Sequence, residues 1–145
     1  MLCVSSGGGH WVQLLRLRPA LDGLDVAYVC VRREYGRQVA GERFYRVVDA
    51  TRWSRVALVR MAIQMVLILL RERPDVVIST GAAPGFVALR IGRLLGARTV
   101  WIDSVANAGK LSLSGRRIGR YADLWLTQWP HLAGPGGPRY EGSVL

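Results

Sequence analysis

Three glycines and a histidine, Gly7, Gly8, Gly9 and His10, directly follow the first four or five residues, which have the apolar character of a short strand. Apolar residues then recur at helical spacing, beginning at Trp11. Glycines in such a turn permit a positive φ and leave no Cβ to keep a ligand away, and the N–H groups and dipole of the next helix favour an anion. An imidazole at the turn can be hydrogen-bonded and can titrate. This stretch predicts a phosphate-binding turn beside a histidine.

Two nucleotide-binding motifs are not completed here. The dinucleotide fingerprint fits Gly7 and Gly9, but Val12 stands where a third glycine is required, and no acidic residue closes the second expected strand near Cys30. No Gly-Lys-Ser/Thr sequence follows to make a Walker loop. A NAD site is therefore not expected. The alternative of a plain glycine turn within a parallel α/β domain stays open.

Strand-like and helix-like patterns alternate about six times along the chain. This alternation predicts an α/β fold: a Rossmann-like three-layer domain with a mostly parallel sheet and helices on both faces. At 145 residues and 50% hydrophobic, the chain is most simply one domain, residues 1–145. The expected strands lie in residues 1–5, 25–31, 44–48, 75–79, 99–102, 124–127 and 143–145, and the expected helices near residues 11–17, 53–72, 86–95 and 111–121.

The polar and glycine-rich segments follow the expected strands, where ligands of a parallel sheet bind. A second glycine-rich turn, with Gly81 and Gly85, follows the fourth strand, and Pro84 is expected at the first helical position. The fifth strand ends at Asp103 and Ser104. All the unusual residues are thus expected on one edge of the sheet, in residues 5–10, 79–85, 103–107 and 128–130.

The helix expected at residues 53–72 is unusually apolar. Arg60, Gln64 and Arg71 make one narrow polar stripe, and the apolar residues cover an arc of roughly 200°. Packing against a sheet needs only a little over 100°. We expect the surplus to be covered by neighbouring helices, a partner subunit or a lipid surface. The arc consists of Leu58, Met61, Ala62, Met65, Val66, Ile68, Leu69 and Leu70.

The net charge of +10, carried by 19 arginines and one lysine against ten acids, favours an anionic partner. The arginines are scattered, which argues against a nucleic-acid partner. Cys3 and Cys30 lie in apolar runs and have no metal-ligand spacing, so reduced, buried thiols and no metal site are expected. No signal peptide is expected, and the ten apolar residues between Arg60 and Arg71 would rise only ~15 Å of a ~30 Å membrane core. We therefore expect a cytoplasmic protein.

Several segments together resemble a known family. The segments are residues 5–10, 79–85, Leu-Ser-Leu-Ser-Gly-Arg at 111–116, Ala-Asp at 122–123 and Gln-Trp-Pro at 128–130. In this order they resemble the acceptor-side subunit of the split UDP-N-acetylglucosamine transferase of lipid-linked oligosaccharide synthesis, and its bacterial counterparts, the PssD-like exopolysaccharide glycosyltransferase subunits. The Gly-Gly-His turn is similar to the N-terminal domain of MurG. Asp103, Ala106–Asn107 and His131 depart from the family's usual residues and leave sugar and acceptor specificity open.

The resemblance implies the N-terminal half of a GT-B glycosyltransferase, peripheral on the inner face of the cell membrane, which needs a separate donor-binding subunit. Together they would transfer a sugar, GlcNAc or a related hexose or uronic acid, from a UDP-sugar to a polyprenyl-diphosphate-linked acceptor, without a cofactor. Inverting sugar transfer needs a base for the acceptor hydroxyl, and His10 and Asp103 are the two candidates; each has a plain capping role as its alternative. Gln128 and Trp129 would face the partner. The substrate-binding candidates are Gly7, Gly8, Gly9, Gly81, Gly85, Ser104, Ser112, Ser114, Gly115 and Arg116.

Two other classes of function compete with the enzyme. A non-catalytic membrane adaptor would only recruit a partner enzyme. A basic nucleic-acid-binding module would show a steep dependence of binding on salt, but no interleaving of basic and aromatic residues supports it.

Overall fold

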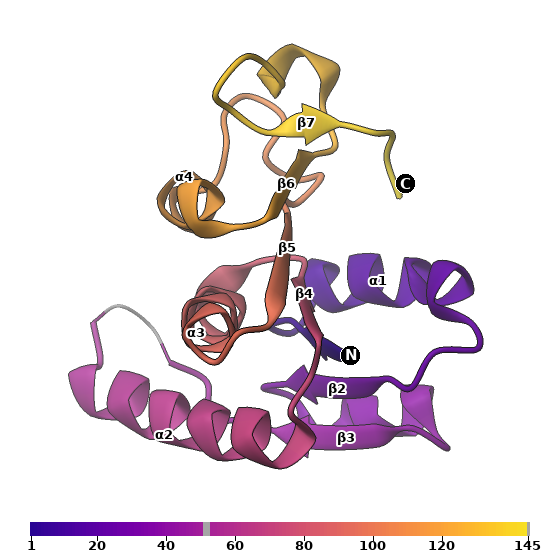
Figure 1. Cartoon of the computed structure of the whole chain (residues 1–145), viewed down its shortest axis with the longest axis vertical. Coiled ribbons are helices and arrows are strands. Elements are labelled where there is room, and N and C mark those ends of the chain that lie inside the picture. The colour runs from indigo at the N-terminus through magenta and orange to yellow at the C-terminus, as the bar shows by residue number, and fades with distance from the viewer. Residues whose placement is uncertain (51–52, 145) are drawn as a thin grey trace.

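The computed structural model describes residues 1–50 and 53–144 of the chain. Within them, seven parallel strands form one sheet in the order β3-β2-β1-β4-β5-β6-β7 (Figure 1). The predicted α/β class and parallel sheet are confirmed, and the strand order is that of a Rossmann fold. The strands are β1 (Leu2–Val4), β2 (Ala27–Cys30), β3 (Arg43–Arg46), β4 (Val76–Ser79), β5 (Arg98–Ile102), β6 (Leu124–Thr127) and β7 (Arg139–Tyr140).

The helices make the two outer layers, as Figure 1 shows. One face of the sheet carries α2 (Arg55–Glu72), α3 (Ala82–Leu94) and α4 (Leu113–Ile118), which pack side by side. The other face carries α1 (Gly9–Arg16) and the chain's C-terminal end. Short 3₁₀ helices complete the connections: η1 (Arg18–Leu21), η2 (Arg33–Val39), η3 (Gly119–Tyr121) and η4 (Pro130–Leu132).

The central strands are buried on both faces, which explains their continuous apolar sequences. All residues of β1 and β2 are buried. Met61 and Met65 of α2 belong to the core on one face, and Trp11 and Leu14 of α1 to the core on the other. Both cysteines are free and buried, as expected, and burial raises the pKa of the Cys3 thiol to about 12.

Some element boundaries differ from the prediction. Helix α3 begins at Ala82, so Pro84 is its third residue rather than its first, and residues 33–39 form a 3₁₀ helix where no helix was expected. The last strand lies at Arg139–Tyr140, whereas Ser143 and Val144 are outside any strand and Leu145 is outside the described residues. Strand β7 pairs with β6 because the Gly- and Pro-rich turn before it returns the chain to the sheet edge.

The surplus apolar surface predicted for α2 exists, on a different face. Of the predicted arc, Met61, Met65, Ile68 and Leu69 are buried, while Leu70 is 52% exposed. Gln64 accepts a hydrogen bond from the Val48 N–H and so is not part of an exposed polar stripe. No helix of the described ranges has both the length and the apolar content to cross a bilayer. The main exposed apolar residues of α2 are Val56, Val59, Ile63 and Leu67.

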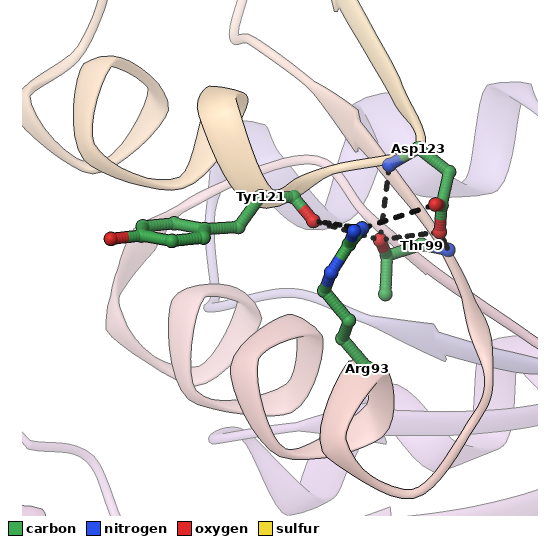
Figure 2. A network of polar contacts seen from close by, with 4 residues as sticks. All are labelled: Arg93, Thr99, Tyr121 and Asp123. Atoms are coloured by element: carbon green, nitrogen blue, oxygen red, sulfur yellow. Dashed lines mark hydrogen bonds and ion pairs between the residues drawn. The ribbon is translucent and has the colours of Figure 1, made fainter.

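A carboxylate ties the end of α3 to β5 and β6 (Figure 2). Asp123 Oδ2 accepts from the Thr99 N–H at 2.7 Å and the Thr99 hydroxyl at 3.0 Å, and Asp123 Oδ1 accepts from Arg93 Nη1 at 3.0 Å. The same Arg93 nitrogen donates to the Tyr121 carbonyl. Burial by itself would raise the pKa of Asp123, but the Thr99 donors and the Arg93 charge outweigh it and hold that pKa below its ordinary value. The Ala-Asp segment at residues 122–123 thus joins three elements.

We expect Asp123→Ala to lower the free energy of unfolding by about 1 kcal/mol, because the N–H of buried Thr99 loses its acceptor. The figure is at the low end for a lost acceptor because the Asp123 side chain is 46% exposed. The depressed pKa makes the stabilisation complete above about pH 3.9, where an unfolded Asp ionises, and removes it as the pH falls through the lower folded value. Asp123→Asn should therefore lose less stability than the native chain as the pH falls below about 3.9.

Urea unfolding at several pH values measures this difference, with Asp75→Asn, at an exposed residue, as the matched control. Equal acid sensitivity in Asp123→Asn and the native chain would contradict the assignment.

Candidate functional site

The site is built where the sheet changes direction. Strands β1 and β4 are neighbours, but the chain leaves β1 for α1 on one face and leaves β4 for α3 on the other (Figure 1). In an open parallel sheet this divergence opens a crevice beyond the carboxyl ends of the two strands. The glycine turn before His10 and the turn at residues 79–81 meet there.

His10 and Thr80 hold these two turns together by reciprocal hydrogen bonds. The Thr80 hydroxyl donates to the His10 carbonyl at 2.7 Å, and His10 Nδ1 lies 2.9 Å from the Thr80 carbonyl oxygen. A carbonyl only accepts, so Nδ1 carries the proton, and in the neutral ring Nε2 has a free lone pair. Within residues 1–50 and 53–144, Nε2 has no hydrogen-bond partner. This tautomer is the one that a general base requires.

Gly81 makes room for the His10 ring. A Cβ at Gly81 would stand 2.6 Å from ring atoms Cε1 and Nδ1. Gly81 has φ 137° and ψ −177°, a backbone conformation that is almost confined to glycine. Ala82 follows with φ 65°, itself unusual for a residue with a Cβ. The turn is strained at the point where it meets the histidine.

The first glycine turn is partly covered by η2. The Gly8 N–H donates to the Tyr35 hydroxyl at 3.2 Å, and a Cβ at Gly7 would lie 3.0 Å from Arg32 Cγ. Gly8 has φ 66° and precedes the first residue of α1, Gly9, without a side-chain cap. Gly8 and Gly9 therefore allow close approach, although the Gly8 N–H already donates within the chain, and the space beside Gly7 is filled by Arg32.

Asp103 lies beneath the site. The residue is 2% exposed, and its carboxyl accepts from three donors: the Ser104 N–H and Asn107 Nδ2 on Oδ1, and the Ser112 N–H on Oδ2. These bonds fix the loop between β5 and α4. Gly115 packs against the same carboxyl, because a Cβ there would lie 2.5 Å from Oδ2.

Gln13, which the sequence analysis did not single out, connects α1 to the β5 and β6 loops. Its Nε2 donates to Ser104 Oγ at 3.0 Å, and its Oε1 accepts from the Val105 N–H at 3.0 Å and from Gln128 Nε2 at 2.7 Å. Gln13 and Gln128 are 5% and 4% exposed. The only sequence signal for Gln13 is an amide among the apolar residues of a helix that must bury one face.

Gln128 and Trp129 form hydrogen bonds with other segments of this chain. Gln128 also donates to the Asp103 carbonyl and accepts from the Val144 N–H, which holds the C-terminal segment. Trp129 Nε1 donates to the Val105 carbonyl, and its side chain stays partly exposed.

An open pocket of about 190 Å³ lies beside His10. The structure brings four predicted site residues to it, His10, Ser104, Ser112 and Ser114, together with Asn107. Ser112 caps α4 by accepting from the Gly115 N–H. Gly85 does not line this pocket; it lies where α3 packs so closely on β4 that a Cβ would stand 1.8 Å from Ser79 Oγ. Arg116 is exposed on α4, and among the described residues no three His, Cys, Asp or Glu side chains gather to hold a metal.

The sequence matches a family described as "Oligosaccharide biosynthesis protein Alg14 like" over residues 27–141. The UDP-N-acetylglucosamine transferase subunit ALG14 of Eremothecium gossypii is 32% identical over 158 aligned residues, covering 87% of this chain and 70% of the relative. The subunit of the same name from Yarrowia lipolytica is 32% identical over 69 residues, covering 43% of this chain and 32% of the relative.

Solved structures share the fold. MurG from Acinetobacter baumannii matches 99% of this chain and 45% of its own with a TM-score of 0.78 at 13% identity. UDP-N-acetylglucosamine 2-epimerase from Rickettsia bellii matches 99% of this chain and 44% of its own with a TM-score of 0.71, also at 13% identity. The chain thus spans less than half the length of these two proteins. At such identities the likeness shows the fold alone.

We expect Gly81→Ala to destabilise the chain by about 1–3 kcal/mol and to move the His10 ring, because it adds a clash to a strained backbone. Gly96→Ala is the matched control: Gly96 also has a positive φ, of 89°, but a Cβ there meets nothing within 4 Å. Urea unfolding gives the cost of each substitution, and the chemical shift of the His10 imidazole reports the displacement. A His10 resonance unchanged in Gly81→Ala would contradict the contact.

Proposed function

This chain belongs to the Alg14-like family of oligosaccharide biosynthesis proteins, and on that premise we propose that it is the acceptor-binding subunit of a two-component glycosyltransferase. With a donor-binding subunit it transfers a sugar from a UDP-sugar to a polyprenyl-diphosphate-linked acceptor, as the PssD-like subunits that it resembles would. Residues 1–145 act in this proposal as one acceptor-binding domain.

The observation that carries the proposal is the tautomer of His10 beside an open polar pocket. Because Nδ1–H is bonded to the Thr80 carbonyl, Nε2 is left to accept a proton. In the transfer, the acceptor hydroxyl oxygen bonds to the anomeric carbon, its proton passes to Nε2, and the bond from that carbon to the UDP oxygen breaks. UDP leaves with the electron pair of that bond.

Of the two candidate bases we assign the proton transfer to His10 and a positioning role to Asp103. The Asp103 oxygens already accept from three donors and are buried. Asp103 holds the loop that carries Ser104 and the cap residue Ser112, whose side chains line the pocket. Those hydroxyls are suited to bind the acceptor sugar.

The diphosphate and the partner take neighbouring surfaces in this proposal. Gly8 and Gly9, where an added Cβ would meet nothing closer than 4.0 Å, leave the backbone open to a phosphate, and the exposed Arg116 on α4 adds a positive charge. The exposed part of Trp129 contacts the donor-binding subunit, while Gln128 supports it from within. Preorganised backbone dipoles and arginines stabilise the charge that develops on the diphosphate without a metal.

The outward ridge of α2, formed by Val56, Val59, Ile63 and Leu67, docks on an anionic membrane surface. These residues are between 55% and 75% exposed, and at 100° per residue they fall within an arc of about 80°. Arg60 and Arg71 lie along one side of that arc, about 20–40° beyond it. A contiguous apolar patch marks an interaction surface, and flanking arginines favour acidic lipid headgroups.

The test is turnover by this chain with a donor-binding subunit from the same organism, using a UDP-sugar and a polyprenyl-diphosphate-linked acceptor. We expect the pair to be active and each subunit alone inactive. His10→Asn should lower kcat by about 10²–10⁴-fold while the complex still forms in a pull-down, because the Asn amide can replace Nδ1 on the Thr80 carbonyl but supplies no proton acceptor in place of Nε2. Leu94→Gln, an exposed substitution on α3 outside the pocket and the ridge, is the control.

Association without turnover for any UDP-sugar would favour the membrane adaptor. Full activity of His10→Asn would show that His10 does not accept the proton.

We expect the double substitution Ile63→Ser and Leu67→Ser to weaken binding to anionic vesicles by at least about ten-fold, because two exposed apolar side chains no longer enter the lipid interface. Co-sedimentation with vesicles at low salt measures the partition, and Leu94→Gln is again the control. An unchanged partition would show that the ridge does not face lipid.

A further inference from the structure

A second cavity lies between the three helices on one face of the sheet. It has a volume of about 360 Å³, within the range of ~300–1,000 Å³ usual for small-molecule sites. Its walls are almost entirely apolar, formed by Leu58 of α2, by Ala83, Phe86 and Val87 of α3, and by Leu113 of α4. Figure 1 shows these helices side by side on the face opposite α1.

This cavity adjoins the His10 pocket. Leu113 and Ser114, in the first turn of α4, line both spaces. Ser114 and the exposed Arg117 also line the cavity and make part of its wall polar. A molecule that crosses this turn therefore meets apolar walls, then a hydroxyl and a guanidinium, and then the polar pocket beside the imidazole.

The apolar walls reach the ridge of α2 around the helix and not directly. Leu58 lies about 100° from Val59 about the helix axis, and the partly exposed Ala62 and Val66 occupy the arc between them. Leu58, Phe86 and Val87 pack against the core yet remain partly exposed to the cavity. An apolar path thus leads from the ridge to the edge of the His10 pocket.

We propose, resting on the function proposed above, that this inter-helix cavity binds the isoprene units next to the diphosphate of a polyprenyl-linked acceptor. A hydrocarbon chain fits the apolar walls, and the anionic diphosphate that follows it meets Ser114 and the positive charge of Arg117. The sugar beyond the diphosphate then enters the pocket of His10. The cavity thereby positions the acceptor sugar relative to His10 and selects acceptors that carry a prenyl chain.

The test measures binding to the chain alone, with farnesyl diphosphate and inorganic diphosphate as probes in the absence of detergent. We expect farnesyl diphosphate to bind at least about ten-fold more tightly, because burial of only a few methylene groups gives that factor. Ala83→Phe fills the cavity and should bring the two affinities to within about two-fold of each other. Leu113→Gln makes its wall polar and should act in the same direction; Leu113 is 43% exposed, so this substitution keeps the chain folded.

Leu94→Gln, 80% exposed and away from both spaces, is the matched control and should keep the ten-fold preference. A preference unchanged in both cavity variants would overturn the proposal. The proposal would also be overturned if Ile63→Ser/Leu67→Ser lost the preference for farnesyl diphosphate while the cavity variants kept it, because the prenyl chain would then lie on the ridge.

The binding measurement needs neither the partner nor a UDP-sugar, so its outcome is separate from that of the transferase assay. If the protein prefers farnesyl diphosphate, loses that preference in the cavity variants, and yet supports no sugar transfer, the prenyl-binding cavity stands and the proposed transferase reaction is wrong. If sugar transfer occurs but farnesyl diphosphate binds no more tightly than inorganic diphosphate, the transferase reaction stands and the prenyl-binding cavity is wrong.

Discussion

The reciprocal hydrogen bonds between His10 and Thr80 close the junction on which the site depends. They join the first residues of α1 to the turn that follows β4, two segments that the fold directs to opposite faces of the sheet. The same bonds set the tautomer of the imidazole and require a glycine at position 81. One contact therefore fixes the geometry of the crevice and leaves the free nitrogen of the histidine.

A layer of buried polar groups supports this junction from below. Gln13 and Gln128 connect α1, the β5 loop and the C-terminal segment, and Asp103 holds the loop that leads to α4. A buried amide or carboxylate is costly unless its hydrogen bonds are made, and here each of the three makes several within the chain. Such a satisfied network admits few alternative arrangements, so the walls of the pocket are preorganised.

The two faces of the sheet have different roles. The face with α1 contains an aromatic cluster, in which Trp11 stacks on Tyr35 with ring centroids 5.4 Å apart. The face with α2, α3 and α4 keeps a cavity and an exposed apolar ridge. Polar chemistry at the edge of the sheet thus adjoins an apolar cavity on the face of α2, α3 and α4, an arrangement suited to a ligand with a charged head and a hydrocarbon chain.

The sequence alone determined the order and type of the main elements, because buried parallel strands and amphipathic helices differ in period and length. It also located the turns with Gly9 and Gly81, since strand ends of a parallel sheet share one edge. Only the tertiary structure showed that Gly85 and Gly115 serve close packing, that Asp103 and Gln128 are buried, and that Gln13 joins them. It also placed the exposed stripe of α2 at Val56 and Ile63. These features depend on contacts between residues up to 115 positions apart, such as that of Gln13 with Gln128, and no local pattern of residue types encodes such distances.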